Sequence, residues 1–158
     1  MNPSQNFETD HLITADGVRI GYRKIGSAPA LILLYGGLQS SASFTDLAVA
    51  LSDDFTVYIP DRRGRGLSDL YGKEDGLAAE TGDLLVLVHH TGAKYIFALS
   101  SGAVIALNTA LQEPILTKVA VYEPPIPPDG SVFSKLDRDY EKAMRKGDAG
   151  RAFIATLK

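Results

Sequence analysis

Residues 98–102, with the sequence ALSSG, follow an apolar run typical of a buried strand and precede a segment typical of a helix. Ser100 therefore stands in a turn between a strand and a helix. Such a turn needs small residues two positions before and two positions after the serine, here Ala98 and Gly102, and it lifts the hydroxyl clear of the sheet. This spacing is typical of a serine nucleophile that attacks a carbonyl carbon.

Ser100 has a second interpretation, because serine is also a common N-cap residue, and the turn sequence alone leaves both open. Two backbone N–H groups favour the nucleophile. The N–H of Ser101 lies at a helix N-terminus, where the helix dipole favours negative charge, and the glycine-rich turn at residues 35–38, which ends an earlier strand, can present another N–H toward the same spot. Two such donors can form an oxyanion hole, in which the loss of one costs about 3–4 kcal/mol.

A serine nucleophile also needs a base, most often a histidine, and an acid that orients the base. The three histidines, His11, His89 and His90, all precede Ser100, and we expect structural roles for them. The catalytic histidine is therefore expected to be absent from these 158 residues. Glu123 is the candidate acid, because it follows a strand that ends at the sheet edge where Ser100 lies; alternatively, it only fixes a proline-rich turn.

The elements that position these residues alternate along the chain. An Asp-Gly turn joins two short strands at 11–14 and 18–25 into a hairpin. Further strands are expected at 30–35, 55–60, 95–99 and 117–122. Helices are expected at 77–90 and 101–113, and a helix followed by a turn at 41–54. This order predicts an α/β fold with a mainly parallel sheet, helices on both faces and an N-terminal antiparallel hairpin, with function at the carboxyl ends of the strands.

The chain contains four motifs in this order: LLYGG at 33–37, PDRRGRGLS at 60–68, ALSSGA at 98–103 and VYEPP at 121–125. Together they resemble the α/β-hydrolase superfamily over roughly residues 10–158, in particular bacterial hydrolases that carry an Asp-Arg-Arg-Gly-x-Gly-x-Ser loop and a Tyr-Glu-Pro-Pro sequence.

The resemblance implies a role for each candidate residue. It implies Ser100 as the nucleophile and Gly37 and Ser101 as oxyanion donors, and some members, haloalkane dehalogenases among them, carry the acid at the position of Glu123. Tyr35 departs from the pattern, because many relatives have a histidine there, usually with a structural role.

Relatives of this kind continue well beyond this length, with a helical cap followed by two strands and a helix that carries the histidine. Residues 1–128 are therefore expected to form the N-terminal part of the hydrolase core, and residues 129–158 the start of the cap, in a chain that is truncated or naturally short. The strand at 117–122 would then be an unpaired edge, which favours self-association.

Composition excludes several other classes. The chain is 45% hydrophobic and 22% charged, and its net charge of −3 offers no bulk attraction to nucleic acid or to an anionic membrane. It has no cysteine, which excludes disulfides and thiolate chemistry, and no His/Asp/Glu cluster has metal-ligand spacing, so neither a metal nor another cofactor is expected. Without a signal peptide or a membrane-spanning run, the expectation is a soluble cytoplasmic protein.

The loop that follows the strand at 55–60 contains Arg62, Arg63 and Arg65. These arginines can bind an anionic group, but such residues are more often solvated or paired with nearby acids such as Asp61 and Asp69.

The favoured function is a serine hydrolase that acts on a small ester through an acyl-enzyme and is weak or inactive as this isolated chain. One alternative is a nucleotide-binding module in which Asp61 holds a ribose, although Gly36-Gly37 lacks the G-x-G-x-x-G spacing. The other is a non-catalytic fragment that needs a partner chain.

Overall fold

The computed structural model describes residues 7–70, 72, 75–126, 142–143, 146–148, 150–151 and 154. The chain divides into two units, Met1–Pro125 and Ile126–Lys158, and the fold described below is that of the first. The cap and the boundary expected after residue 128 stay predictions. Residues 129–141, with which the cap was expected to begin, lie outside the described residues.

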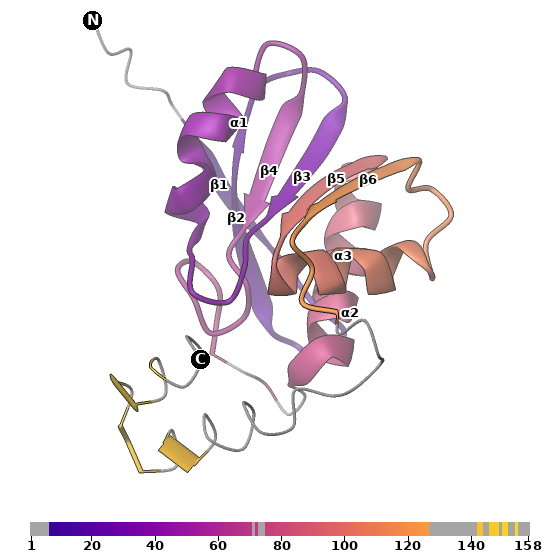
Figure 1. Cartoon of the computed structure of the whole chain (residues 1–158). Coiled ribbons are helices and arrows are strands. Elements are labelled where there is room, and N and C mark those ends of the chain that lie inside the picture. Colours follow the sequence, from indigo (N-terminus) through magenta and orange to yellow (C-terminus); the bar gives the residue numbers. More distant parts are fainter. Residues whose placement is uncertain are drawn as a thin grey trace, which may run out of the picture. The chain divides into compact units, whose positions relative to one another are not determined.

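The first unit contains an alternation of strands and helices (Figure 1). In chain order the elements are β1 (Glu8–Ile13), β2 (Arg19–Ile25), β3 (Ala30–Leu34), the 3-10 helix η1 (Ser41–Phe44), α1 (Thr45–Leu51), β4 (Thr56–Pro60), α2 (Gly76–Thr91), β5 (Tyr95–Leu99), α3 (Ser101–Ala110) and β6 (Lys118–Tyr122).

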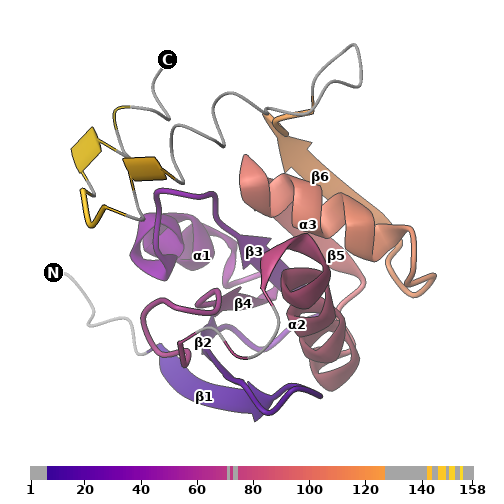
Figure 2. The same cartoon turned by 90° about the horizontal axis from the view of Figure 1, so that it is seen from below.

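These strands form one six-stranded sheet in the order β1-β2-β4-β3-β5-β6. The hairpin strands β1 and β2 pair antiparallel, and β2 pairs antiparallel with β4. Strands β4, β3, β5 and β6 run parallel, so their carboxyl ends share one sheet edge. Figure 2 shows α1 on one side of the sheet and α2 and α3 on the other. The predicted α/β fold, its mainly parallel sheet and its N-terminal hairpin are confirmed.

Strand β3 contributes to two hydrophobic cores, one on each face of the sheet. Ile32 and Leu34 pack with residues of α2 and α3, whereas Leu31, Leu33 and Tyr35 pack with residues of η1, α1 and β4. Successive side chains of a strand point to opposite faces, so a strand covered on both faces must be apolar at every position. This explains the uninterrupted aliphatic run of β3.

Two predicted helical segments differ in detail from the structure. In the segment at 41–54, where a helix followed by a turn was expected, the helix begins as η1, continues as α1 to Leu51 and is followed by a turn; at the junction of η1 and α1 the Thr45 hydroxyl donates to the Ala42 carbonyl, 2.9 Å away. Such side-chain bonds compete with regular helix. Helix α3 ends at Ala110, three residues before the predicted end at 113, and the chain then tightens into a turn in which Gln112 N–H donates to the Thr109 carbonyl, three residues back.

Strand β6 forms one border of the sheet and is largely exposed. Within the described residues it pairs with β5 alone, so its other side presents unpaired backbone groups. Self-association through this edge stays a prediction. None of the helices in the described part of the chain is both long enough and apolar enough to cross a membrane.

Candidate active site

The turn between β5 and α3 holds Ser100 in an unusual backbone conformation, with φ 53° and ψ −126°. Among the described residues, Ser100 and Glu123 are the only non-glycine residues with positive φ. Such strained positions persist where the surrounding structure enforces them, and they cluster at functional sites. The Ser100 N–H donates to the Tyr122 carbonyl at 2.9 Å, and the Ser100 carbonyl accepts from Ala103 N at 2.9 Å, so both neighbouring elements fix this turn.

The Ser100 side chain does not cap α3. The residue occupies the N-cap position, but its hydroxyl forms no hydrogen bond with the helix N–H groups. The N-cap interpretation therefore does not explain why a serine stands at this position, and the hydroxyl remains available for chemistry.

Close packing against β3 explains the small residues of the turn. A Cβ atom at Gly102 would lie 2.5 Å from the Tyr35 carbonyl oxygen and 2.7 Å from that of Leu34. Ala98 is fully buried and pairs with Leu34 in the sheet. Only a glycine lets the first turn of α3 approach the end of β3 this closely.

The two predicted oxyanion donors lie beside Ser100. A Cβ atom at Gly36 would lie 3.0 Å from Ser100 Cβ, and one at Gly37 would lie 3.6 Å from Ser101 Oγ. Gly36 N–H is occupied, because it donates to Gln39 Oε1 at 3.0 Å. Within the described part of the chain, neither Gly37 N–H nor Ser101 N–H donates a hydrogen bond to another protein group. Both donors therefore remain free for a ligand oxygen.

Glu123 lies at the same sheet edge as Ser100. It directly follows β6, with φ 48°, next to the residue whose carbonyl accepts from Ser100 N–H. Its side chain is exposed and forms no hydrogen bond or ion pair with other described residues. The alternative in which this carboxylate fixes the proline-rich turn through its own contacts is thus not supported.

The three histidines lie away from Ser100. His89 binds Glu113, and His90 Nε2 lies 3.1 Å from the Tyr22 hydroxyl, both at the end of α2. This end precedes β5, whose two ends lie roughly 13 Å apart at a rise of about 3.3 Å per residue. His11 is on β1, four strand spacings or roughly 19 Å from β5. None of the three is placed to act as base for Ser100.

Asp61 holds the loop after β4 against the sheet. It is fully buried, and its carboxylate accepts from Arg23 Nη1 at 2.7 Å and from Leu67 N at 3.0 Å. Burial opposes ionisation, but hydrogen bonds from Ser41, Leu67 and Arg23 outweigh it and hold the pKa of Asp61 below its ordinary value. A carboxylate that is buried and engaged in this way is not available to a ribose, which contradicts the nucleotide-binding alternative.

Replacing Asp61 by asparagine is expected to lower the free energy of unfolding by about 1.5–3 kcal/mol at pH 7, because hydrogen bonds to a charged group are lost. The folded-state pKa lies below the ordinary value of 3.8, so this stabilisation is present above pH 3.8 and disappears as the pH falls through the folded-state value. Urea unfolding between pH 7 and pH 3 should show the two proteins converging in acid. A constant difference across this range would contradict a role for the charge, and Asp53→Asn, at an exposed position, is the matched control.

Tyr35 takes the position where a histidine was expected from the resemblance, and it serves as a structural link. Its ring is fully buried, and its hydroxyl accepts from Arg62 N at 2.9 Å and donates to Asp61 at 3.5 Å. It therefore joins the end of β3 to the loop after β4, and its presence does not conflict with the geometry around Ser100.

Two arginines of this loop pair with α2. Arg62 forms a bidentate ion pair with Glu80, and its Nη1 donates to Ser101 Oγ at 2.9 Å. Arg63 is 1% exposed and donates to both carboxylate oxygens of Asp83, at 2.7 and 2.6 Å. Burial tends to raise the pKa of Asp83, and the adjacent guanidinium opposes this rise. The second acid bound by Arg63 is Asp16, at 3.0 Å.

The arginine partners expected from the sequence, Asp61 and Asp69, are wrong. Asp61 pairs with Arg23, and Asp69 pairs with Arg19 at 3.2 Å, because the hairpin strand β2 lies beside β4 and brings its own arginines to the loop. The sequence reasoning also missed Glu80 and Asp83. Their spacing of three residues places them on one face of a predicted helix, and this was the available signal.

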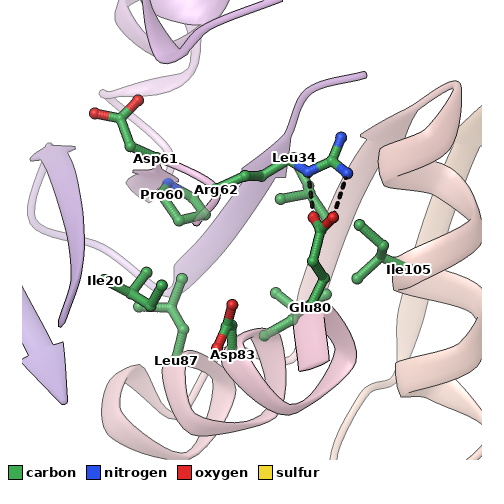
Figure 3. A pocket seen from close by; sticks show the side chains of 10 residues that line it. Ile20, Leu34, Pro60, Asp61, Arg62, Glu80, Asp83, Leu87 and Ile105 are labelled. Atoms are coloured by element: carbon green, nitrogen blue, oxygen red, sulfur yellow. Dashed lines mark hydrogen bonds and ion pairs between the residues drawn. The ribbon is translucent and has the colours of Figure 1, made fainter. Parts of the chain in front are cut away.

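A small cavity of about 20 Å³ lies beneath the Arg62–Glu80 pair (Figure 3). It has room for about one water molecule. Its lining comprises Ile20, Leu34, Pro60, Asp61, Arg62, Glu80, Asp83, Leu84, Leu87 and Ile105. Ser100, Gly37 and Glu123 do not line this cavity, so it is not the space in which Ser100 would meet a substrate.

Known proteins resemble this chain in sequence and in fold. A hydrolase named YraK from Bacillus subtilis strain 168, itself uncharacterized, is 34% identical over 115 residues, which make up 70% of this chain and 42% of that protein. A 2-(acetamidomethylene)succinate hydrolase from Mesorhizobium japonicum is 34% identical over 73 residues, or 44% of this chain and 26% of that protein. The chain thus spans less than half the length of these curated relatives.

A solved structure of an α/β hydrolase from Sphaerobacter thermophilus superposes with a TM-score of 0.81 and 29% identity, covering 94% of this chain and 59% of that one. Epoxide hydrolase A from Mycobacterium thermoresistibile superposes with a TM-score of 0.63 and 27% identity, covering 73% of this chain and 39% of that one. Residues 31–157 match the profile described as "Alpha/beta hydrolase family". The chain therefore belongs to the alpha/beta hydrolase family.

Proposed function

We propose that Ser100 is the nucleophile of a hydrolase that cleaves small carboxylic esters. The observation that carries this proposal is the strained backbone of Ser100 beside two N–H groups, those of Gly37 and Ser101, that have no partner among the described residues. A hydroxyl that does not cap its helix and stands next to two free donors has the arrangement that acyl transfer requires.

The reaction would proceed in two steps. Ser100 Oγ bonds to the carbonyl carbon, its proton passes to a base, and the carbonyl oxygen becomes an oxyanion that accepts from Gly37 N–H and Ser101 N–H. The tetrahedral intermediate collapses, the base returns the proton to the leaving alkoxide, and an acyl-enzyme and an alcohol result. Water then attacks the acyl-enzyme by the same route and releases a carboxylic acid with Ser100 restored.

The base is proposed to be a histidine other than His11, His89 and His90, oriented by Glu123. The position of Glu123 supports this, because its exposed carboxylate stands at the sheet edge of Ser100 without another partner among the described residues. As an isolated chain of these 158 residues, the protein is accordingly proposed to be weak or inactive. Amide bonds are the second candidate substrate, favoured by the name of the Mesorhizobium japonicum relative.

The test is covalent labelling of the chain by a fluorophosphonate probe, with and without added imidazole as an exogenous base. We expect one adduct, located by peptide mass mapping at Ser100, that forms faster with imidazole and is absent in Ser100→Ala. Ser52→Ala is the matched control, since Ser52 directly follows α1 near the opposite sheet edge and its hydroxyl only donates to Val49 O.

Two results would contradict the proposal. One is labelling that persists unchanged in Ser100→Ala, which would place the reactive group elsewhere. The other is the absence of any adduct at Ser100 even at high imidazole concentration in a protein whose circular dichroism shows it to be folded.

A further inference from the structure

Arg65 differs from the other arginines of its loop. Arg62 and Arg63 each bind carboxylates, whereas Arg65 has no ion pair within the described part of the chain. Instead, its Nη1 donates to two neutral backbone oxygens, those of Gly36 and Gln39, both at 3.1 Å. The guanidinium carbon also lies 5.8 Å from the centre of the Tyr35 ring, close enough for a cation–π contact.

The segment bound by Arg65 is the one that carries Gly37. Residues 36–39 follow β3, and the Gln39 side chain closes the segment by accepting from Gly36 N–H at 3.0 Å. Arg65 also links the two ends of this segment, because it donates to the carbonyl oxygens of both Gly36 and Gln39. Because Gly36 and Gly37 have wide conformational freedom, the direction of the Gly37 N–H depends on these few bonds.

We propose that Arg65 is a positioning residue, which holds the 36–39 segment so that Gly37 N–H points at the developing oxyanion. This inference rests on the proposed function of Ser100. The half-buried guanidinium is permanently charged, and neither of its two acceptors neutralises it, so its positive charge also favours negative charge at the nearby site.

The experiment measures fluorophosphonate labelling of Ser100 in the presence of imidazole as a function of probe concentration. The phosphonyl oxygen occupies the place of the oxyanion, so misplacement of Gly37 N–H lowers the maximal labelling rate more than it changes the half-saturating probe concentration. For Arg65→Ala we expect a maximal rate about 10–100-fold lower, the scale of a 1 Å misplacement. Arg65→Lys should recover part of the rate, because both hydrogen bonds come from a single nitrogen.

Amide hydrogen exchange gives a second readout that needs no activity. Arg65→Ala should speed exchange in the peptide that contains residues 36–39 and leave β5 and α2 unchanged. Arg19→Ala is the matched control, because that arginine pairs with Asp69, is about half exposed and makes no contact with the 36–39 segment. It should change neither readout.

The outcomes separate the two proposals. If wild type is labelled at Ser100 and Arg65→Ala reaches the same maximal rate, the role of Arg65 is overturned and the nucleophile stands. If wild type is not labelled at Ser100, the proposed function fails, and exchange alone decides whether Arg65 holds the segment. Unchanged exchange at 36–39 in Arg65→Ala would then overturn the positioning role as well.

Discussion

Methionine in place of Arg63 is expected to lower the free energy of unfolding by about 3–5 kcal/mol at pH 7, the cost of breaking a buried ion pair by removing one partner. Arg63 is 1% exposed and donates to Asp83 on α2 and to Asp16 in the hairpin turn. Without the guanidinium, the Asp83 carboxylate remains buried with its principal counter-charge lost. Methionine fills part of the space and supplies no donor.

Urea unfolding of Arg63→Met and of the double variant Arg63→Met/Asp83→Leu tests this explanation. The double variant should recover most of the loss, because an apolar pair of similar volume is often as stable as a buried ion pair. The Asp16 carboxylate would still accept from the Thr14 hydroxyl and is partly exposed.

Lowering the pH should also reduce the loss of unfolding free energy caused by Arg63→Met. Burial raises the pKa of Asp83. A carboxyl with a raised folded-state pKa takes up a proton as the pH falls through that value, and the penalty for burying its charge then disappears. Two results would contradict the role assigned to the Arg63–Asp83 ion pair. One is that Arg63→Met loses less than 1 kcal/mol of unfolding free energy at pH 7, and the other is that the double variant recovers none of this loss.

Alanine at Gly102 is expected to destabilise the fold by about 2–3 kcal/mol, the upper part of the range for overpacking. The added Cβ would meet the carbonyl oxygens of Tyr35 and Leu34 at the end of β3, at 2.5 and 2.7 Å, and the backbone at the end of this central strand cannot move aside cheaply. Relief requires α3 to shift away from β3, which also displaces the neighbouring turn of Ser100. Fluorophosphonate labelling should therefore slow together with the fall in stability.

Gly82→Ala is the matched control for this prediction. Gly82 lies inside α2, and a Cβ there would meet nothing within 4 Å. The same substitution should stabilise the protein by about 0.5–1 kcal/mol, because alanine favours helix over glycine. Thermal unfolding of both variants should give shifts of opposite sign, and shifts of the same sign would show that contact with β3 does not decide the outcome.

Local sequence patterns predicted most of the fold because they report burial directly. The aliphatic run at 30–35 indicates a strand covered on both faces, and β3 has this environment. Gly92 follows the helix predicted over 77–90, and it caps the C-terminus of α2 in a left-handed conformation, with φ 65°. The end of α3 was predicted less accurately, because the chain tightens into a turn after Ala110.

The candidate site was predictable only in part, for a physical reason. The Ser100 turn is local, so its small neighbours and its sheet edge could be inferred from a short stretch of sequence. Ion-pair partners depend on which elements become neighbours in space, and nothing in the loop sequence indicates that Arg62 binds Glu80, whereas Arg65 binds backbone oxygens after β3. The contacts that Gln39 and Arg65 make with the 36–39 segment became visible only with the fold.

The positive φ angles at Ser100 and Glu123 affect which substitutions evolution can accept at these two positions. Each position costs about 1–3 kcal/mol relative to a relaxed residue, and glycine would avoid the penalty. Selection for stability alone would therefore favour glycine at both positions and would remove both predicted catalytic groups together. Retention of side chains at these two positions in related sequences would separate selection for chemistry from selection for folding.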